Sequence, residues 1–336
     1  MKKNFVTTFF TVTCLAITSL FLTSCSSSGV GDTRTFTFVD SHPDGYPTVI
    51  GNREFARLVY ERTNGDIKID IFPNGVLGDE KTTLEQVQFG GLEFIRITSS
   101  MLASLDPSLN VLSLPYMYES REAMFEVLDG EVGDYYREKL KDIGMIGLAW
   151  VDPGSRSFYN TRREITSPAD LNGLKIRVQE TKLMVDLINL LGGSPTPMSM
   201  GEVYSSLQTG VIDGAENNFP SYVSSSHHEV AQYYTINEHT TSPEIIVMNL
   251  RAFESLTEEQ QQIILEAAKD AALVQRTEWL KQEKEAEEIA IASGAKITRL
   301  TDEQRQAFAD VVLPIYDDYS QYREDIERIR NAQGGK

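Results

Sequence analysis

Residues 67–75 read IKIDIFPNG. In this segment isoleucines alternate with charged residues, which is the two-residue period of a β-strand, and Pro-Asn-Gly ends the strand in a turn. On its N-terminal side, apolar residues recur at helical spacing in 48–62, and a further strand signal lies at 35–39. A helical segment at 81–89 and a short strand at 94–97 follow. The order strand, helix, strand, helix, strand predicts a parallel sheet covered by helices.

The middle of the chain repeats this alternation, with expected strands at 145–149, 174–178 and 211–217 and expected helices at 182–191 and 202–208. The segment PEIIVMNL at 243–250 contains a continuous apolar run, which predicts a buried strand. A helical pattern without Pro or Gly then runs from Thr257 to about Ala292. This length exceeds that of the usual globular helix and predicts a brace across more than one domain.

These elements predict an α/β protein of two lobes, with strand crossovers between the lobes and a long bracing helix. The first lobe is expected to comprise mainly residues 34–155 and 243–256, and the second lobe mainly 156–242. The bracing helix takes 257–292, and a helical C-terminal region takes 293–336. Ligands of such folds bind outside the carboxyl ends of parallel strands or between lobes, so we expect the site in an interlobe cleft.

The first 24 residues are expected to be an export signal that is cleaved before Cys25. Two lysines precede a run at 4–21 that contains no charged residue, and the segment ends in LTSC at 22–25. A transmembrane anchor is the rival interpretation, but six Ser or Thr residues inside the run disfavour a permanent span. The LTSC ending resembles a bacterial lipoprotein signal, which implies that Cys25 is lipidated and that residues 25–33 are a flexible tether.

Composition excludes several classes of function. The 336 residues include 49 acidic and 31 basic side chains, a formal charge of −18, so neither nucleic acid nor an anionic membrane surface is an expected partner. Membrane contact is expected through the lipid anchor alone. Of the two cysteines, Cys14 lies in the signal, which excludes disulfides, thiolate catalysis and Cys-ligated metal from the exported body.

Motifs for common catalytic and cofactor chemistry are missing from the sequence. It contains no Walker loop, no dinucleotide-binding GxGxxG unit, no HExxH, no GxSxG and no EF-hand loop. His227 and His228 are adjacent, and adjacent helical side chains point about 100° apart, so we interpret them as an ordinary surface pair rather than metal ligands. We therefore predict a ligand-binding protein that is not an enzyme, with no catalytic residue, cofactor or metal.

Two arginines are candidates for binding a negatively charged ligand. Arg177 lies inside the apolar run LKIRV at 174–178, and Arg156 lies among small and aromatic residues after a strand. A buried guanidinium costs free energy without a partner, and its planar fork of donors matches a carboxylate. For each arginine the alternative is an internal salt bridge. Asn217 could bind a ligand or form a turn, and Tyr159 could lie against a sugar ring or fill the core.

Longer stretches carry a family resemblance. The most specific are IKIDIFPNGVLG at 67–78, DLNGLKIRV at 170–178, PTPM at 195–198 with EVY at 202–204, and LQTGVIDGAEN at 207–217. From about residue 36 to about residue 319, the chain resembles a substrate-binding protein of a tripartite ATP-independent periplasmic (TRAP) transporter, of the dicarboxylate-binding-protein-like family. The resemblance implies a two-lobed periplasmic binding protein that closes on its ligand and delivers it to integral-membrane permease subunits driven by an ion gradient.

The same resemblance implies roles for individual residues. Arg177 pairs with the ligand carboxylate, Arg156 is a second basic residue, and Asn217 lies beside them. The segments HPDGYP at 42–47, GSRSFYN at 154–160, GAENN at 214–218 and EH at 238–239 before PE at 243–244 are similar to the members that bind hexuronates such as glucuronate and galacturonate. The expected contacts to the sugar are His42, Glu80, Arg96, Gln179, Asn217 and Glu244, with Tyr159 near its ring.

The sequence therefore predicts a periplasmic, lipid-anchored subunit that captures D-glucuronate or D-galacturonate. One alternative is the same transporter role for another organic acid, such as a C4-dicarboxylate, an aldonate or a keto acid. Others are an exported enzyme acting on uronates and a sensory lipoprotein without a permease. The uronate epimer, the oligomeric state and the membrane that holds the lipid are left open.

Overall fold

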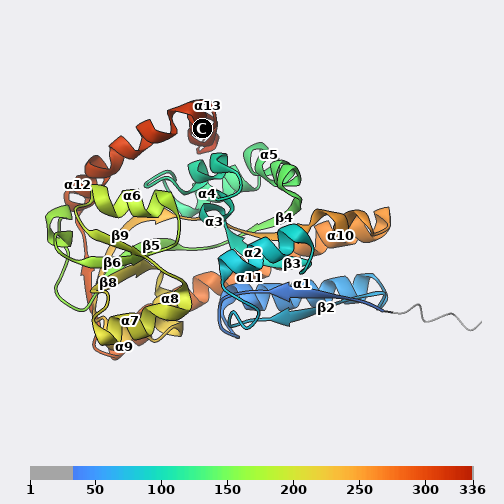
Figure 1. Cartoon of the computed structure of the whole chain (residues 1–336), viewed down its shortest axis with the longest axis horizontal. Coiled ribbons are helices and arrows are strands. Elements are labelled where there is room, and N and C mark those ends of the chain that lie inside the picture. The colour runs from blue at the N-terminus through green and yellow to red at the C-terminus, as the bar shows by residue number, and fades with distance from the viewer. Residues whose placement is uncertain (1–32, 335–336) are drawn as a thin grey trace, which may run out of the picture. The chain divides into compact units, whose positions relative to one another are not determined.

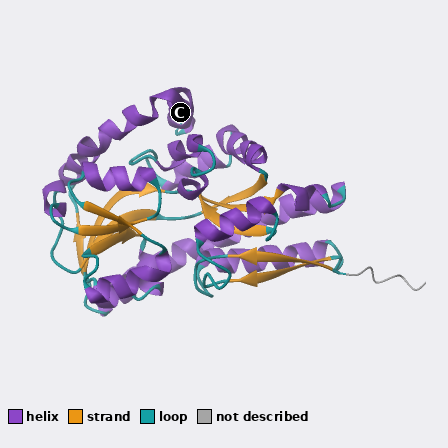
Figure 2. Cartoon of the chain, in the orientation of Figure 1, coloured by secondary structure: helices purple, strands orange, loops and turns teal. Residues whose placement is uncertain are grey.

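Two β-sheets flanked by helices form the protein (Figures 1 and 2). The computed structural model describes residues 33–334, so the expected signal, Cys25 and all but the last residue of the expected tether lie outside the described residues. Within residues 33–334, no helix combines the length and the apolar character needed to cross a bilayer. The predicted α/β class with helices around both sheets is confirmed.

The first sheet has the strand order β2-β1-β3-β10-β4. Its strands are β1 (Arg34–Val39), β2 (Ile67–Phe72), β3 (Phe94–Thr98), β4 (Met145–Val151) and β10 (Glu244–Asn249). β1 runs parallel to β2 and β3, and helices α1 (Pro47–Arg62) and α2 (Glu80–Phe89) form the crossovers, as predicted. β10 lies antiparallel between β3 and β4, and all of its residues are buried, as its apolar run predicted.

The second sheet has the strand order β11-β9-β5-β8-β6-β7. Its strands are β5 (Ser155–Asn160), β6 (Lys175–Val178), β7 (Ser194–Pro197), β8 (Gly214–Asn217), β9 (Tyr233–Thr241) and β11 (Lys296–Arg299). β5 and β9 were not predicted, because the polar residues in SRSFYN and YYTINEHTT hide any apolar alternation although most of these positions are buried.

The remaining helices of residues 33–334 are α3 (Ser99–Leu102), α4 (Arg121–Leu128), α5 (Glu131–Lys139), α6 (Lys182–Leu190), α7 (Val203–Thr209), α8 (Phe219–Ser224), α9 (His227–Val230), α10 (Leu250–Glu254), α11 (Glu258–Ala292), α12 (Asp302–Val312) and α13 (Arg323–Ala332). Short 3₁₀ helices span Pro107–Ser113, Leu140–Ile143, Pro168–Leu171, Met200–Glu202 and Leu313–Tyr322. The C-terminal region, expected to be helical, also contains β11, which pairs in parallel with β9 at the edge of the second sheet.

The part built on the first sheet is called here the first lobe, and the part built on the second sheet the second lobe. The chain passes between them at residues 152–154 and again at 242–243. Helix α11, which is 35 residues long, packs against α1 and β4 of the first lobe and against α8 of the second (Figure 1). A capping box between Thr257 and Gln260 starts this helix, and buried alanines allow its close approach to the first lobe.

Helix α11 also fixes the first of these crossovers. The Gln275 Oε1 atom accepts from the backbone N–H of Asp152 at 2.7 Å, and its Nε2 donates to the Asp152 carbonyl at 2.9 Å. Gly154 has a φ of +62°, and a Cβ there would lie 2.3 Å from Cζ2 of Trp279. Only glycine therefore fits this position, and the helix holds the segment that joins the two lobes.

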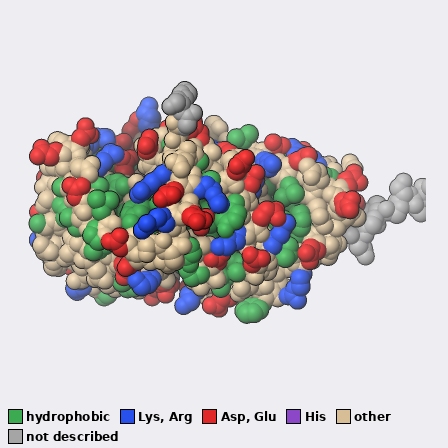
Figure 3. Space-filling model, turned by 90° about the horizontal axis from the view of Figure 1, so that it is seen from above, with side chains coloured by type: hydrophobic (Ala, Val, Ile, Leu, Met, Phe, Trp, Pro, Cys, Tyr) green, Lys and Arg blue, Asp and Glu red, His purple; other side chains and the backbone are tan. Residues whose placement is uncertain are grey.

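Acidic and basic side chains are interspersed on the face of the molecule shown in Figure 3. The chain as a whole carries a formal charge of −18. That face therefore offers no continuous basic surface of the kind that binds a polyanion.

Candidate ligand-binding site

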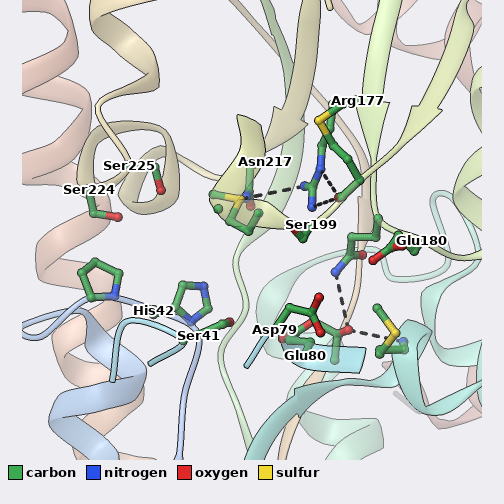
Figure 4. A pocket seen from close by; sticks show the side chains of 18 of the residues that line it. Ser41, His42, Asp79, Glu80, Arg177, Glu180, Ser199, Asn217, Ser224 and Ser225 are labelled. Carbon is green, nitrogen blue, oxygen red and sulfur yellow. Dashed lines mark hydrogen bonds between the residues drawn. The ribbon is translucent and has the colours of Figure 1, made fainter. Parts of the chain in front are cut away.

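A cavity of about 360 Å³ lies between the lobes and is lined by residues of both. Figure 4 shows His42, Asp79 and Glu80 on one side of it and Arg177 and Asn217 on the other. Of the nine predicted ligand-binding residues, eight line this cavity: His42, Glu80, Arg96 and Glu244 in the first lobe, and Arg156, Arg177, Gln179 and Asn217 in the second. The ninth, Tyr159, does not line it.

Arg177 has no acidic partner among the described residues. Its side chain comes from β6 and is only 4% exposed. Nε and Nη2 donate to the carbonyl oxygen of Met198 at 2.9 and 2.8 Å, and Nη1 lies 3.9 Å from Sδ of Met200. Burial lowers the pKa of Arg177, and the nearby positive charge of Arg156 lowers it further. The edge formed by Nη1 and the second hydrogen of Nη2 is thus left for an anion.

Arg156 differs, because the internal salt bridge that was the alternative for both arginines is present here. Nη2 donates to Oε1 and to the carbonyl oxygen of Glu216, each at 2.8 Å, and Nε donates to Oε2. Burial of Glu216 raises its pKa, but the Arg156 charge outweighs this and lowers the pKa to about 2. Nη1 donates to Oδ1 of Asn217 at 3.1 Å. The guanidinium of Arg156 is therefore largely satisfied before any ligand arrives.

The cavity wall of the first lobe is organised around Arg96. This guanidinium is 1% exposed and contacts Oδ1 of Asp40 at 2.9 Å, Glu80, and Oε1 of Glu244 at 3.4 Å. Although burial raises the pKa of Asp40, Arg96 and His42 outweigh it and hold that pKa far below its usual range. Three carboxyl groups thus share one guanidinium, and this wall is the acidic side of the cavity.

Glu244 is the least satisfied carboxyl group on that wall. It is buried, and its Oε2 atom has no hydrogen-bond partner within residues 33–334. Burial raises the pKa of Glu244 above its usual range, and Arg96 opposes the shift. His42 lies nearby, stacked on Tyr46 at 3.9 Å between ring centroids and bonded through Nδ1 to Asp40 at 3.1 Å. Acceptors and an imidazole therefore line the acidic side.

Polar contacts between the lobes border the cavity. The Oε1 atom of Gln179 in the second lobe accepts from Oγ of Ser100 in the first at 3.1 Å. The hydroxyl of Tyr46 lies 2.8 Å from Oγ of Ser221 across the same boundary. Because each bond joins the two lobes, the position of Gln179 depends on how the lobes meet.

Tyr159 lies outside the cavity lining because its ring is packed in the core of the second lobe. It contacts Tyr222 and Tyr234, and its hydroxyl lies 2.7 Å from Nδ1 of His227. His227 itself lines the cavity. The interpretation of His227 and His228 as a surface pair was wrong: they are 1% and 8% exposed, because α9 packs against α7 and α8.

Several lining residues were not predicted: Ser41, Asp79, Lys81, Glu180, Met198, Ser199, Met200, Ser224, Ser225 and His227. Some of them follow the carboxyl end of a strand closely, as Ser41 follows β1, Glu180 follows β6 and Met198 follows β7. The rule that ligands bind outside the carboxyl ends of parallel strands could have found these three. No comparable signal in the sequence marks Ser224, Ser225 or His227.

The fold agrees with comparisons to known proteins. The sequence pattern of the family described as "Bacterial extracellular solute-binding protein, family 7" matches residues 38–322 of this chain. The chain belongs to this family. The resemblance to TRAP solute-binding proteins that was noted in the sequence is thereby confirmed.

Three relatives illustrate the similarity. A solute-binding protein of Chromohalobacter salexigens is 40% identical over 288 residues, which cover 86% of this chain and 85% of that protein. A TRAP periplasmic solute-binding protein of Roseobacter denitrificans, solved with bound β-D-glucuronate, is 38% identical, with a TM-score of 0.86 over 88% of this chain and 99% of its own. One of Xanthobacter autotrophicus, solved with bound β-D-galacturonate, is also 38% identical, with a TM-score of 0.86 over 89% and 100%.

Proposed function

We propose that this solute-binding protein captures a hexuronate, D-glucuronate or D-galacturonate, in the interlobe cavity. The observation that carries the proposal is Arg177, a buried cation with no acidic partner among residues 33–334, on the cavity wall opposite a row of acceptors. A carboxylate fits the open edge of its guanidinium in bidentate fashion. The structures solved with glucuronate and galacturonate support this ligand class.

The distribution of charge on the cavity walls sets the orientation of the bound sugar acid. Its carboxylate faces Arg177, and its hydroxyls face Glu80, Glu244 and His42 on the acidic side. Hydroxyl groups donate to carboxylates, whereas a second carboxylate of the ligand would be repelled there. The site therefore favours a polyhydroxylated monocarboxylate over a C4-dicarboxylate.

We infer that binding of the anion favours closure of the lobes. A buried guanidinium without a counter-charge is costly, so the empty protein favours an open arrangement that hydrates Arg177. A bound carboxylate removes this cost and shifts the population toward the closed arrangement. A micromolar dissociation constant corresponds to about −8 kcal/mol, which one bidentate pair and several hydroxyl bonds can supply.

The wider role we propose is transport. The protein would be exported to the periplasm, cleaved before Cys25, held to a membrane by lipid and paired with TRAP permease subunits. The LTSC sequence at 22–25 and the family support this role. Metabolic labelling with a palmitate analogue tests the anchor: the wild type should incorporate label, and Cys25→Ser should lose it. Label retained by the variant would contradict the assignment of Cys25.

A thermal-shift screen tests the ligand class. D-glucuronate or D-galacturonate at 100 times the dissociation constant should stabilise the protein by about 2.7 kcal/mol, a rise in Tm of several degrees. Glucose, which lacks the carboxylate, and succinate, which adds a second one, should give much smaller shifts. A shift with succinate and none with either uronate would contradict the proposal. Conversion of galacturonate to a product on incubation would indicate an enzyme instead.

A further inference from the structure

The contact between His227 and Tyr159 has no role in the function described so far. His227 lines the cavity, whereas Tyr159 lies behind it and bonds to Nδ1 of His227 at 2.7 Å. Nε2 of the same ring forms no hydrogen bond within residues 33–334 and, unlike Nδ1 of His228, is not among the atoms that the protein fully encloses. One nitrogen of His227 is therefore held by the core, and the other has no partner within residues 33–334, in a residue that lines the cavity.

The hydrogen-bonding needs of Tyr159 fix which nitrogen carries the proton. The bond to Nδ1 is the one hydrogen bond of the Tyr159 hydroxyl within the part of the chain that the structure describes. If Nδ1–H donated to it, the buried phenolic proton would be left without an acceptor, which costs free energy. The phenol therefore donates to Nδ1. Burial, followed by the charge of Arg177, lowers the pKa of His227 to about 3, so the ring is neutral and its proton is on Nε2.

The register of the second sheet brings this histidine toward Arg177. Arg177 on β6 is paired with Ala215 on β8, and Ala215 is paired with Tyr159 on β5. Residues paired in this way point to the same face, so Arg177 and Tyr159 are separated by two strand spacings, about 10 Å, with only the methyl group of Ala215 between them. His227 bonds to Tyr159 at one end of this row, and Arg177 stands at the other.

We propose that His227 is a ligand-binding residue whose Nε2–H donates to the carboxylate of the sugar acid beside Arg177, and that Tyr159 is a positioning residue that fixes this tautomer. The inference rests on the proposed function, since it needs a carboxylate at Arg177. A neutral donor suits the place, because a second cation would repel Arg177. A carboxylate has acceptor sites for both groups.

Calorimetry of four variants with D-glucuronate tests the contact. His227→Phe removes the donor and should weaken binding about 10- to 100-fold, the loss of one charge-assisted hydrogen bond. His227→Gln restores an N–H at a similar position and should recover part of the affinity. Tyr159→Phe should weaken binding about 3- to 10-fold. His228→Phe is the matched control, because this neighbour does not line the cavity, and its affinity should equal that of the wild type.

Nitrogen NMR of ¹⁵N-histidine-labelled protein tests whether Tyr159 fixes the tautomer of His227 or only packs against its ring. The chain has four histidines, so the His227 signals are assigned by their loss in His227→Phe. In the wild type Nδ1 should be unprotonated and Nε2 protonated, and saturating glucuronate should shift Nε2. Tyr159→Phe should change the tautomer ratio. A protonated Nδ1 in the ligand-free wild type, or an affinity unchanged in a folded His227→Phe, would overturn the proposal.

These results stay distinct from a failure of the proposed function. If the wild type binds neither glucuronate nor galacturonate, the proposed ligand is wrong, and so is the contact inferred from it. If the wild type binds a uronate and His227→Phe binds it equally well, the transport role stands and only the inference about His227 is wrong.

Discussion

Replacing Arg177 by methionine separates ligand binding from stability more clearly than any other change. Methionine has a similar length and fills the buried space, but it removes the cation and its donors. In the ligand-free protein the lost bonds are those to the Met198 carbonyl. Removing a buried charge that has no acidic partner within residues 33–334 offsets that loss. We therefore expect the ligand-free variant to keep the wild-type Tm within a few degrees.

The effect on binding should be large. The open edge of the guanidinium can donate two charge-assisted hydrogen bonds, each contributing about 1.5–3 kcal/mol. Without them the ligand carboxylate enters a buried site that lacks the counter-charge of Arg177. Arg156 does not replace it, because its guanidinium is already paired with Glu216. We expect a loss of about 4 kcal/mol, which is about 10³-fold in Kd.

Titration calorimetry with D-glucuronate, beside thermal unfolding of the ligand-free protein, measures both quantities. Arg163→Met is the matched control: Arg163 also donates from Nε and Nη2 to backbone carbonyls of the second lobe, those of Asp170 and Asn172, but it is exposed and does not line the cavity. Its Kd should stay within a factor of two of the wild type. Glucuronate affinity unchanged in Arg177→Met would refute the role of this guanidinium.

Three further predictions concern the acidic wall and the crossover between the lobes. Glu244→Gln should weaken glucuronate binding about tenfold, because an amide oxygen is a poorer acceptor for a sugar hydroxyl than a carboxylate, and calorimetry showing tighter binding would contradict this. Burial raises the pKa of Asp152 from 3.8 to about 6, so between these values the folded state holds more protons than the unfolded state and stability falls as pH rises. Between pH 3.5 and 7, the free energy of unfolding of the wild type, measured in urea, should fall by about 3 kcal/mol relative to that of Asp152→Asn. Parallel pH profiles of the two proteins would exclude the raised pKa of Asp152. Gly154→Ala should lower the free energy of unfolding by about 3 kcal/mol, because its Cβ would clash with Trp279. Gly173→Ala is the control: it is also at positive φ but has no atom within 4 Å of the added Cβ, so it should cost about 1 kcal/mol. Equal losses of the two variants in urea unfolding would show that the clash with Trp279 is relieved.

Local patterns predicted the elements whose residues alternate or repeat clearly. The isoleucines of β2, the apolar run of β10 and the Pro- and Gly-free α11 all lie where the sequence placed them. β5 and β9 escaped prediction because their buried positions carry Arg, Asn, His and Thr. Three of these side chains, Arg156, Thr235 and Thr240, bond to groups distant in the chain, namely Glu216 and the carbonyls of Ile165 and Ser113. A pattern of apolar residues cannot reveal a strand whose buried side chains are polar.

The two cavity arginines show why site chemistry needs the fold. In the sequence Arg156 and Arg177 had the same two interpretations, a ligand contact or an internal salt bridge. Antiparallel pairing of β5 with β8 sets Phe158 opposite Glu216, which brings Arg156 within reach of the Glu216 carboxylate. Arg177 instead faces Ala215 and Thr196 on its neighbouring strands, and neither carries a charge.

By itself, the sequence determined the α/β class, the long α11 helix, the family and the residue types able to hold a sugar acid. These depend on periodicity, composition and motifs, which are local properties of the chain. Only the tertiary structure decided which guanidinium is left without a carboxylate, that His227 lines the cavity and that Tyr159 lies behind it. Strand register and the meeting of the two lobes set these relations, and both arise from contacts between residues far apart in the chain.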